Sequence, residues 1–386
     1  FVHGVFGRRL RGALDLWPVP DEGEDRERGK EGIVNTVSTP RLRHRKLDLK
    51  TGRVDLSHGS GGRSMAQLIS EIFHEAFANE WLDQGNDQAT FATPTGGRMV
   101  MTTDGYVVSP LFFPGGNIGS LAVHGTINDV AMGGARPVAL SASFIIEEGF
   151  PLADLKVIAD TMGKAAREAG VPIVTGDTKV VERGKADGVF ISTAGIGVVA
   201  EGVDLSGDRA RPGDKVIVSG SMGDHGVAIM SSRENLTFET AILSDSAALN
   251  GLTEVMIAAG APHLRLMRDP TRGGLAATLN ELAQQSKVGI RLEEDAIPVK
   301  PEVHAACEFL GLDPLNVANE GKLIAIVAPE GADAVLAAMK AHPLGVDAAI
   351  VGEVIEDDQF FVQMTTSFGG GRIVDWLAGE QLPRIC

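Results

Sequence analysis

Cysteines, long apolar runs and phosphate-binding loops are scarce in this sequence of 386 residues, and each scarcity excludes a class of protein. Two cysteines cannot form a disulfide framework, so we expect a reducing, cytoplasmic location. No apolar run approaches the roughly 18 residues of a membrane helix, so we expect no membrane association. The start shows no charged end followed by an apolar block, and we expect no secretory signal.

Positive charge is also in deficit, because 35 Lys and Arg stand against 51 Asp and Glu. The first 50 residues hold 11 basic and 8 acidic side chains, so the remainder holds 24 and 43, a net charge of −19. Such an acidic body repels nucleic acid and anionic membranes, and we predict neither as a partner. A phosphorylated ligand would need metal ions or backbone amides.

The common nucleotide-binding loops are missing. There is no G-x-x-x-x-G-K-[ST] segment. The segment GIGVVA at 195–200 fits the dinucleotide pattern G-x-G-x-x-A, but it lies in an apolar strand pattern with no helix after it. We interpret it as a plain strand.

What is present is an alternation of strand and helix patterns from Val54 onward, which predicts a mixed α/β chain of two domains. Residues 1–50 are charged and poorly periodic, and we expect a disordered or artefactual extension there. The Gly-, Asp- and Pro-rich stretch 201–214 is typical of a linker. We therefore predict domains at 51–205 and 206–378, and a mobile tail at 379–386.

Polar turn residues gather in the first predicted domain: Asp87, Asp104, Asn128, Asp129 and Asp177. Asp104 and Asp177 directly follow apolar strands, and side chains at such strand ends can converge on one crevice. Dispersed carboxylates suit Mg²⁺, although Asp–Gly and Gly–Asp pairs also simply mark turns. Together with Lys179, the set indicates a metal–nucleotide site.

Three glycine loops precede helical patterns and could cradle an anion with bare amides, although each also suits an ordinary helix cap. They are HGSGG (58–62), PGGN (114–117) and TRGG (271–274). His225 in GDHG and Glu320 in ANEGK lie in polar, glycine-flanked segments, where each is either a surface residue or an acid–base group.

The two cysteines differ in setting. Cys307 has helical spacing, and we expect a buried, inert thiol. Cys386 is the last residue, so it cannot belong to a prenylation box, and its accessible thiol favours a function. Pro383 stiffens the approach to it, and Ile385 offers an apolar foothold.

The sequence resembles the HypE family of hydrogenase maturation proteins, which are carbamoyl dehydratases, in eight segments taken in order. These are HGSGG, TTDGYVVSPLFFPGGNIGSLAVHGTINDVAMGGARP, IVTGDTKVVERG, VSGSMGDHG, RDPTRGGL, PVKP, ANEGKL and the terminal PRIC. The resemblance runs from about Val54 to Cys386. At NDQA, related ATP enzymes often show paired aspartates, so Asn86 is not assigned to a metal.

The resemblance implies a two-domain fold like that of aminoimidazole ribonucleotide synthetase, a homodimer through the first-domain sheets, and ATP near the dimer interface. It implies that a HypF-type carbamoyltransferase loads Cys386 with a carbamoyl group. ATP then drives loss of water to give a thiocyanate. The cyano group passes to iron held by a HypC–HypD-type complex, in maturation of nickel–iron hydrogenase.

Individual roles follow under the same resemblance. Magnesium is assigned to Asp87, Asp104 and Asp177, and ATP to these residues together with Asn128, Asp129, Gly176 and Thr178. Glu320 is the first candidate for the base, with Lys179 and His225 as alternatives or electrostatic helpers. The resemblance places Glu320 and Lys179 close to the docked tail.

Other functions remain open. A selenophosphate synthetase would want a cysteine in the early glycine loop, yet none precedes Cys307, and a thiamine monophosphate kinase has no use for Cys386. A non-enzymatic thiol carrier or metallochaperone leaves Asp104, Asp177 and Lys179 without a role. The intact acidic turns argue against an inactive scaffold.

Overall fold

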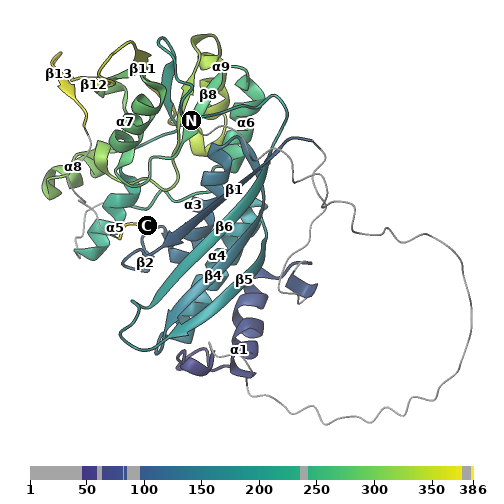
Figure 1. Ribbon diagram of the computed structural model, residues 1–386. Coiled ribbons are helices and arrows are strands. Elements are labelled where there is room, and N and C mark those ends of the chain that lie inside the picture. The colour runs from purple at the N-terminus through teal and green to yellow at the C-terminus, as the bar shows by residue number, and fades with distance from the viewer. Residues whose placement is uncertain (1–45, 59–62, 81, 85–95, 235–241, 376–383) are drawn as a thin grey trace, which may run out of the picture. The chain divides into compact units, whose positions relative to one another are not determined.

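The computed structural model describes residues 46–386 except 59–62, 81, 85–95, 235–241 and 376–383 (Figure 1). The predicted extension up to residue 45, and Asp87, therefore lie outside the described residues. Residues 46–50, predicted to belong to that extension, are part of the folded body, because Leu47 and Leu49 pack against its core. No helix in the described part of the chain is long and apolar enough to cross a membrane.

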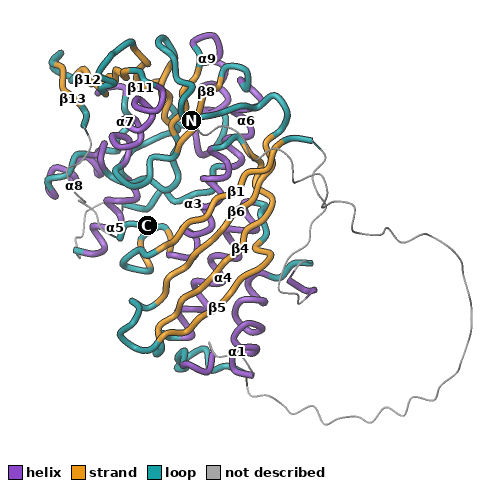
Figure 2. Tube along the Cα trace, viewed as in Figure 1, coloured by secondary structure: helices purple, strands orange, loops and turns teal. Residues whose placement is uncertain are grey.

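A mixed four-stranded sheet of order β1–β6–β4–β5 occupies the first half of the described chain (Figure 2). β4 and β5 run parallel, and the other neighbours run antiparallel. The strands are β1 (Arg98–Tyr106), β6 (Val189–Val199), β4 (Ala135–Glu147) and β5 (Ile173–Val181). Alternate residues of each strand point to opposite faces of the sheet. The residues of one face are buried, and those of the other face are more exposed.

Helix α3 (Ile118–Met132) packs on the buried face, and α4 (Leu152–Ala169) packs beside it, behind the sheet in Figure 2. The short hairpin of β2 (Phe112–Phe113) and β3 (Gly116–Asn117) leads into α3. Asn117 caps α3, because its side chain accepts the Gly119 amide at 2.8 Å. α4 ends at Gly170, whose φ of 69° is the left-handed conformation that glycine tolerates.

A helical segment near the N-terminal end of the described chain covers the β4–β5 side of the same face. It consists of α1 (Arg63–Leu68), a π-helical stretch (Ile69–His74) and α2 (Glu75–Phe77). The rings of Phe73 and Phe144 lie 4.5 Å apart, centroid to centroid, which fixes this segment on β4. The opposite face of the sheet exposes Met99, Met101 and Ile145.

The second half is built on a seven-stranded sheet of order β13–β12–β9–β11–β7–β10–β8. Its strands are β7 (Lys215–Val218), β8 (Leu264–Arg268), β9 (Gly289–Glu293), β10 (Ile324–Val327), β11 (Ala349–Ile355), β12 (Val362–Thr365) and β13 (Gly371–Ile373). Its helices are α5 (Asp224–Arg233), α6 (Asn250–Gly260), α7 (Gly274–Ser286), α8 (Pro301–Leu310) and α9 (Pro329–Lys340). Short 3₁₀ helices span Leu56–His58, Leu82–Gln84, Glu294–Ala296, Pro314–Asn316 and Pro343–Gly345.

The mixed α/β class is confirmed, and the GIGVVA segment lies in β6 up to Val199, as a plain strand. The prediction that Asp104 and Asp177 follow strands is wrong, since β1 continues to Tyr106 and β5 to Val181. The two sheets end and begin on either side of residue 205, yet residues 46–386 form one compact unit. The exact domain boundaries stay predictions.

Candidate functional site

The last three residues lie against the body beside the end of β1, where Figure 1 marks the C-terminus. The Val107 amide donates to a Cys386 carboxylate oxygen at 3.3 Å, and the Ser109 amide donates to the Arg384 carbonyl oxygen at 3.1 Å. Both bonds run from body amides to tail oxygens, and Arg384 has a left-handed φ of 54°. Ile385 is 2% exposed within the core, and Cys386 is half-buried. The predicted foothold of the tail is therefore a buried anchor, whereas Pro383 lies outside the described residues.

His225, the first residue after the start of α5, contacts the tail backbone. Its Nε2 donates to the Ile385 carbonyl oxygen at 2.9 Å, so Nδ1 is unprotonated and accepts from Ser244 Oγ at 2.7 Å. Burial lowers the pKa of this imidazole, which keeps the ring neutral. With both nitrogens occupied while the tail is docked, His225 holds the tail rather than removing a proton. This geometry argues against its predicted alternative role as base.

Glu320 is buried in the loop before β10, at 3% exposure. Its amide donates to Asp245 Oδ1 at 3.0 Å, and Asp245 directly follows the Ser244 that binds His225. No described residue gives Glu320 Oε1 a hydrogen bond. Burial, and then the nearby carboxylates of Asp269 and Asp245, raise the pKa of Glu320 well above its usual range. Glu320 thus has the perturbed environment of an acid–base group.

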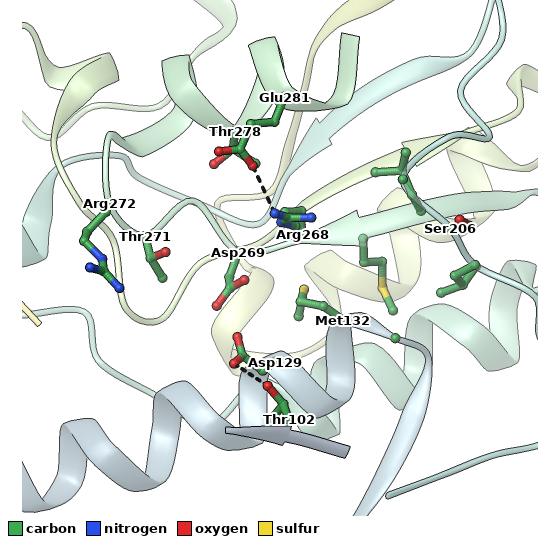
Figure 3. A pocket seen from close by; sticks show the side chains of 15 residues that line it. Thr102, Asp129, Met132, Ser206, Arg268, Asp269, Thr271, Arg272, Thr278 and Glu281 are labelled. Atoms are coloured by element: carbon green, nitrogen blue, oxygen red, sulfur yellow. Dashed lines mark hydrogen bonds and ion pairs between the residues drawn. The ribbon is translucent and has the colours of Figure 1, made fainter. Parts of the chain in front are cut away.

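Asp269 is a second acid of raised pKa; it is half-buried and lies directly after β8. Burial, and then the charge of Asp129, raise its pKa to about 7. Asp129, on α3, has its own pKa raised by burial, although Thr102 Oγ1 donates to its Oδ2 at 3.0 Å. The two carboxyl groups face one another in Figure 3. Like charges at such a place disfavour ionisation of both groups together.

A cavity of about 500 Å³ opens beside these acids, between α3 and β1 on one side and β8 and α7 on the other (Figure 3). Arg268 and Arg272 line it, and Arg268 Nη2 lies 3.0 Å from Glu281 Oε2. The start of α7 is tightly packed, because a Cβ on Gly274 would lie 2.6 Å from the Leu315 carbonyl oxygen. The cavity therefore joins half-buried acids to cationic groups and the TRGG loop.

Asn128 was expected to support phosphates, and its surroundings contradict this. Its side-chain nitrogen donates to the carbonyl oxygens of Ala247, at 3.1 Å, and Glu320, at 3.2 Å. Its oxygen accepts the Leu249 amide at 2.8 Å. Asn128 is 1% exposed, so it links α3 to the loops that carry Asp245 and Glu320 rather than binding a ligand.

Asp104 and Asp177 do not meet within one chain. β1 and β5 are the two edge strands of the sheet, so three strand spacings of about 4.8 Å separate them, about 14 Å in all. The residues also point to opposite faces: Asp104 shares the buried face with Thr193, and Asp177 shares the open face with Ser143. The expected convergence of these two carboxylates on one ion is wrong for a single chain.

Lys179 is also distant from the tail. It lies on β5, at the opposite edge of the sheet from the loop that receives Cys386, and its Nζ binds Asp177 at 2.8 Å. This ion pair lowers the pKa of Asp177. The predicted closeness of Lys179 to the docked tail therefore does not occur within one chain.

The described residues contain no group of three or more His, Cys, Asp or Glu side chains able to hold a metal ion. The predicted magnesium set of Asp87, Asp104 and Asp177 is thus not assembled in one chain, and its first member lies outside the described residues.

A second cavity, of about 350 Å³, adjoins β5 on the buried face. Phe73, Phe77 and Phe144 form an apolar wall, and residues 175–178 form a polar edge. Gly176 is required here, since a Cβ would lie 2.3 Å from the Ala142 carbonyl oxygen. An apolar slot beside polar strand residues has the form of a site for a planar base with a charged tail.

Two residues of the site, Asp269 and Arg233, are not among the residues predicted from the sequence. Asp269 stands in the quoted segment RDPTRGGL, and an acid directly after an apolar strand was the available signal. Arg233, the last residue of α5, donates to Ser109 and Arg384 carbonyl oxygens, at 2.7 and 3.0 Å from Nη2. No local pattern distinguishes this arginine from a solvated one at a helix end.

The two halves match known sequence families. Residues 85–199 match the AIR synthase related protein, N-terminal domain, and residues 211–365 match the AIR synthase related protein, C-terminal domain. The fold and the site between its halves define a two-domain protein of this AIR synthase related class.

Individual relatives narrow the class. The carbamoyl dehydratase HypE of Rhizobium leguminosarum bv. viciae is 76% identical over 342 residues, which cover 89% of this chain and 97% of the relative. A crystal structure of hydrogenase maturation protein HypE in complex with ATP is 50% identical, with a TM-score of 0.83, over 86% of this chain and 99% of that one. HypE in a HypE–HypF complex is 51% identical, with a TM-score of 0.71, over 80% and 99% of the respective chains.

The chain belongs to the HypE family of carbamoyl dehydratases, which are hydrogenase maturation proteins. The family resemblance and the AIR synthase related fold expected from the sequence are confirmed.

Proposed function

We propose that this chain uses ATP to dehydrate a carbamoyl group carried by the sulfur of Cys386, leaving an S-cyano group. The docked tail carries the proposal: Ile385 is buried, and His225, Ser244 and Asp245 lead from its carbonyl to buried Glu320. A docked terminal cysteine, linked through these contacts to a buried acid, suits a reaction on the chain's own end. The high identity to carbamoyl dehydratases favours this function over a kinase or a thiol carrier.

The chemistry explains the need for ATP. The carbamoyl oxygen is a poor leaving group, and transfer of the γ-phosphoryl group to it releases ADP and lets the oxygen depart as phosphate. The nitrogen loses both of its protons as the C–O bond breaks, and a C≡N bond remains on sulfur. The site must exclude water, because an activated thiocarbamate would otherwise hydrolyse.

Glu320 is the proposed base for these protons. In its ionised form, a carboxyl group of raised pKa is a stronger base than a solvated carboxylate. The charged groups that act on Glu320 are carboxylates, which oppose its ionisation. A cation placed nearby would favour the ionised form. Lys179 of a second chain is the proposed cation.

We assign ATP to the cavity beside β5, with its base against the phenylalanine wall and its phosphates toward Gly176, Asp177 and Thr178. Mg²⁺ accompanies the phosphates; Asp177 lies at the edge of this cavity, with its side chain toward the open face of the sheet. Because β5 and the tail lie at opposite edges of one sheet, the phosphates can reach Cys386 only in a homodimer, at the tail of the other chain. The exposed Met99 and Met101 on the open sheet face supply the apolar surface for that dimer.

Partners follow from the same chemistry. A HypF-type carbamoyltransferase would load Cys386, and a complex of one relative with HypF supports this. A HypC–HypD-type complex in the cytoplasm would accept the cyano group.

The test is mass spectrometry of the C-terminal peptide after carbamoyl transfer, with and without ATP. We expect ATP to cause loss of one water at Cys386. Retention of the intact carbamoyl group in the presence of ATP would overturn the proposal. Cys386→Ala should abolish carbamoylation while ATP binding, measured by calorimetry, is unchanged.

A further inference from the structure

The body of the protein holds the tail by its backbone. A backbone oxygen of each of the last three residues accepts a hydrogen bond from the body, and that of Cys386 is a carboxylate oxygen. The donors are the amides of Val107 and Ser109, His225 Nε2 and Arg233 Nη2. These bonds would be the same whatever group the sulfur of Cys386 carried.

Arg233 joins the tail to the loop that receives it. Its Nε and Nη2 donate to the Ser109 carbonyl oxygen at 3.1 and 2.7 Å, and Nη2 also donates to that of Arg384 at 3.0 Å. A planar guanidinium group can bridge two carbonyl oxygens in this way, whereas an ammonium group lacks the fixed fork. α5 thus presents both tail-binding side chains, with His225 near its start and Arg233 at its end.

Side chains of the tail add an anchor and a surface contact. Ile385 is buried in the main core cluster, which contains residues of both halves. Arg384 donates from Nε to the Val107 carbonyl oxygen at 3.1 Å and forms an ion pair with exposed Asp187. The side chain of Ile385 therefore determines how deeply the tail enters the body. The backbone hydrogen bonds determine the position of the Cys386 thiol.

We propose that Arg233 and His225 are positioning residues that hold the C-terminal tripeptide by its carbonyl groups, so that the tail docks equally whether Cys386 is free, carbamoylated or cyanated. The proposal rests on the proposed function in that the docked sulfur is the reacting one. It implies that release of the tail to a partner does not follow from the chemical change on sulfur.

Alkylation of Cys386 by iodoacetamide, followed by mass spectrometry, measures docking without ATP or a carbamoyl donor. We expect Arg233→Ala to accelerate alkylation about tenfold, because a hydrogen bond from a charged donor is lost. Arg233→Lys should give an intermediate rate. His225→Gln, which keeps a donor at a similar reach, should stay near the wild-type rate, and His225→Leu should not.

Buried Cys307 is the internal control, since its pKa is raised to about 11 by burial and it reacts only after unfolding. Arg209→Ala, which removes an arginine paired with Asp204, is the matched control and should leave Cys386 unchanged. A wild-type rate at Cys386 in Arg233→Ala and His225→Leu would overturn the proposal.

If Arg233→Ala unfolds, amide hydrogen exchange at Val107 and Ser109 is measured in Arg233→Lys instead. That variant retains the positive charge but lacks the fork of the guanidinium group. Tail release should lower protection of these two amides, and unchanged protection would contradict the clamp. The S-carbamoylated and S-alkylated chains should show the same protection as the free thiol. If dehydration fails while the two amides stay protected, the proposed function is wrong, but the proposed role of Arg233 and His225 in holding the tail is retained.

Discussion

Glu320 and Asp269 are single residues whose chemistry comes from burial. Burial and neighbouring carboxylates outweigh the charge of Arg268 beside Asp269, so each of the two acids holds its proton more strongly than a solvated carboxyl group. Such groups reduce stability at neutral pH, and a folded chain retains them where a reaction needs them. Their substitutions should therefore separate activity from stability.

Glu320→Gln keeps the shape of the side chain and removes its ability to take a proton. We expect ATP-dependent loss of water at Cys386 to slow by about 100-fold or more, as for loss of a general base. The melting temperature should not fall, because no buried charge has to form. Time-resolved mass spectrometry and thermal unfolding check both parts; an active variant would remove Glu320 from the mechanism.

Asp269→Asn should change how stability depends on pH. The pKa of Asp269 rises from 3.8 to about 7 on folding, so between about pH 4 and 7 the folded chain holds a proton that the unfolded chain has lost. Stability therefore falls as pH rises through this window and is flat above it. The melting temperature of the variant relative to wild type should rise from pH 5 to pH 7 and then level off. Parallel curves for both chains would contradict the raised pKa.

Some of these residues could be predicted from the sequence and others could not. Cys386 and Glu320 lie in segments that contain Gly or Pro and look exposed in the sequence. A role in packing does not explain a reactive group in such a segment, so both residues could be predicted as functional. Asp269 and Arg233 owe their roles to packing between segments more than 100 residues apart in the chain. Asn128 was assigned a wrong role for the same reason, because its three partners come from distant loops.

At the scale of elements, β1 shows why a turn composition does not always end a strand. Asp104–Gly105 has the composition of a turn, yet Gly105 pairs with Ser192 in the ladder and the strand continues to Tyr106. By contrast, α3 and α4 carry clear sequence signals, since their apolar residues have helical spacing and Gly133 and Gly170 follow their last residues. Short strands such as β8 and β13 carry too few residues for a period to be seen.

The contact between α3 and β1 should be sensitive to one methyl group. A Cβ on Gly125 would lie 2.3 Å from Tyr106 Oη, just before the loop that receives the tail. We expect Gly125→Ala to cost about 1–3 kcal/mol in chemical denaturation, because the ring must shift. Gly371→Ala, where nothing lies within 4 Å of the new Cβ, should cost far less. Equal costs would show that the Tyr106 contact is not the cause.

At the scale of the whole molecule, the open sheet face requires a cover. Met101, on the edge strand β1, is 74% exposed, and Met99 lies two residues before it on the same face. If the proposed homodimer forms through this face, Met101→Glu should convert it to a monomer, because two charges would be buried against each other. Light scattering after size exclusion measures the change; Val157→Glu, an exposed apolar position on α4, is the matched control. A dimeric Met101→Glu chain would place the interface elsewhere.

The separation of the two sheet edges leads to a test of the complete enzyme. Asp177, beside the proposed ATP cavity, and the loop that receives Cys386 lie about 14 Å apart across one sheet, so each working site would use both chains. Asp177→Asn and Cys386→Ala should each be inactive alone. In a mixed dimer, one site combines the intact Asp177 of one chain with the intact Cys386 of the other. Random exchange in equal amounts should therefore restore about a quarter of wild-type turnover, since half of the dimers are mixed and each has one intact site. No recovery after verified subunit exchange would mean that each chain completes its own site, and would require the tail or β5 to move across the sheet.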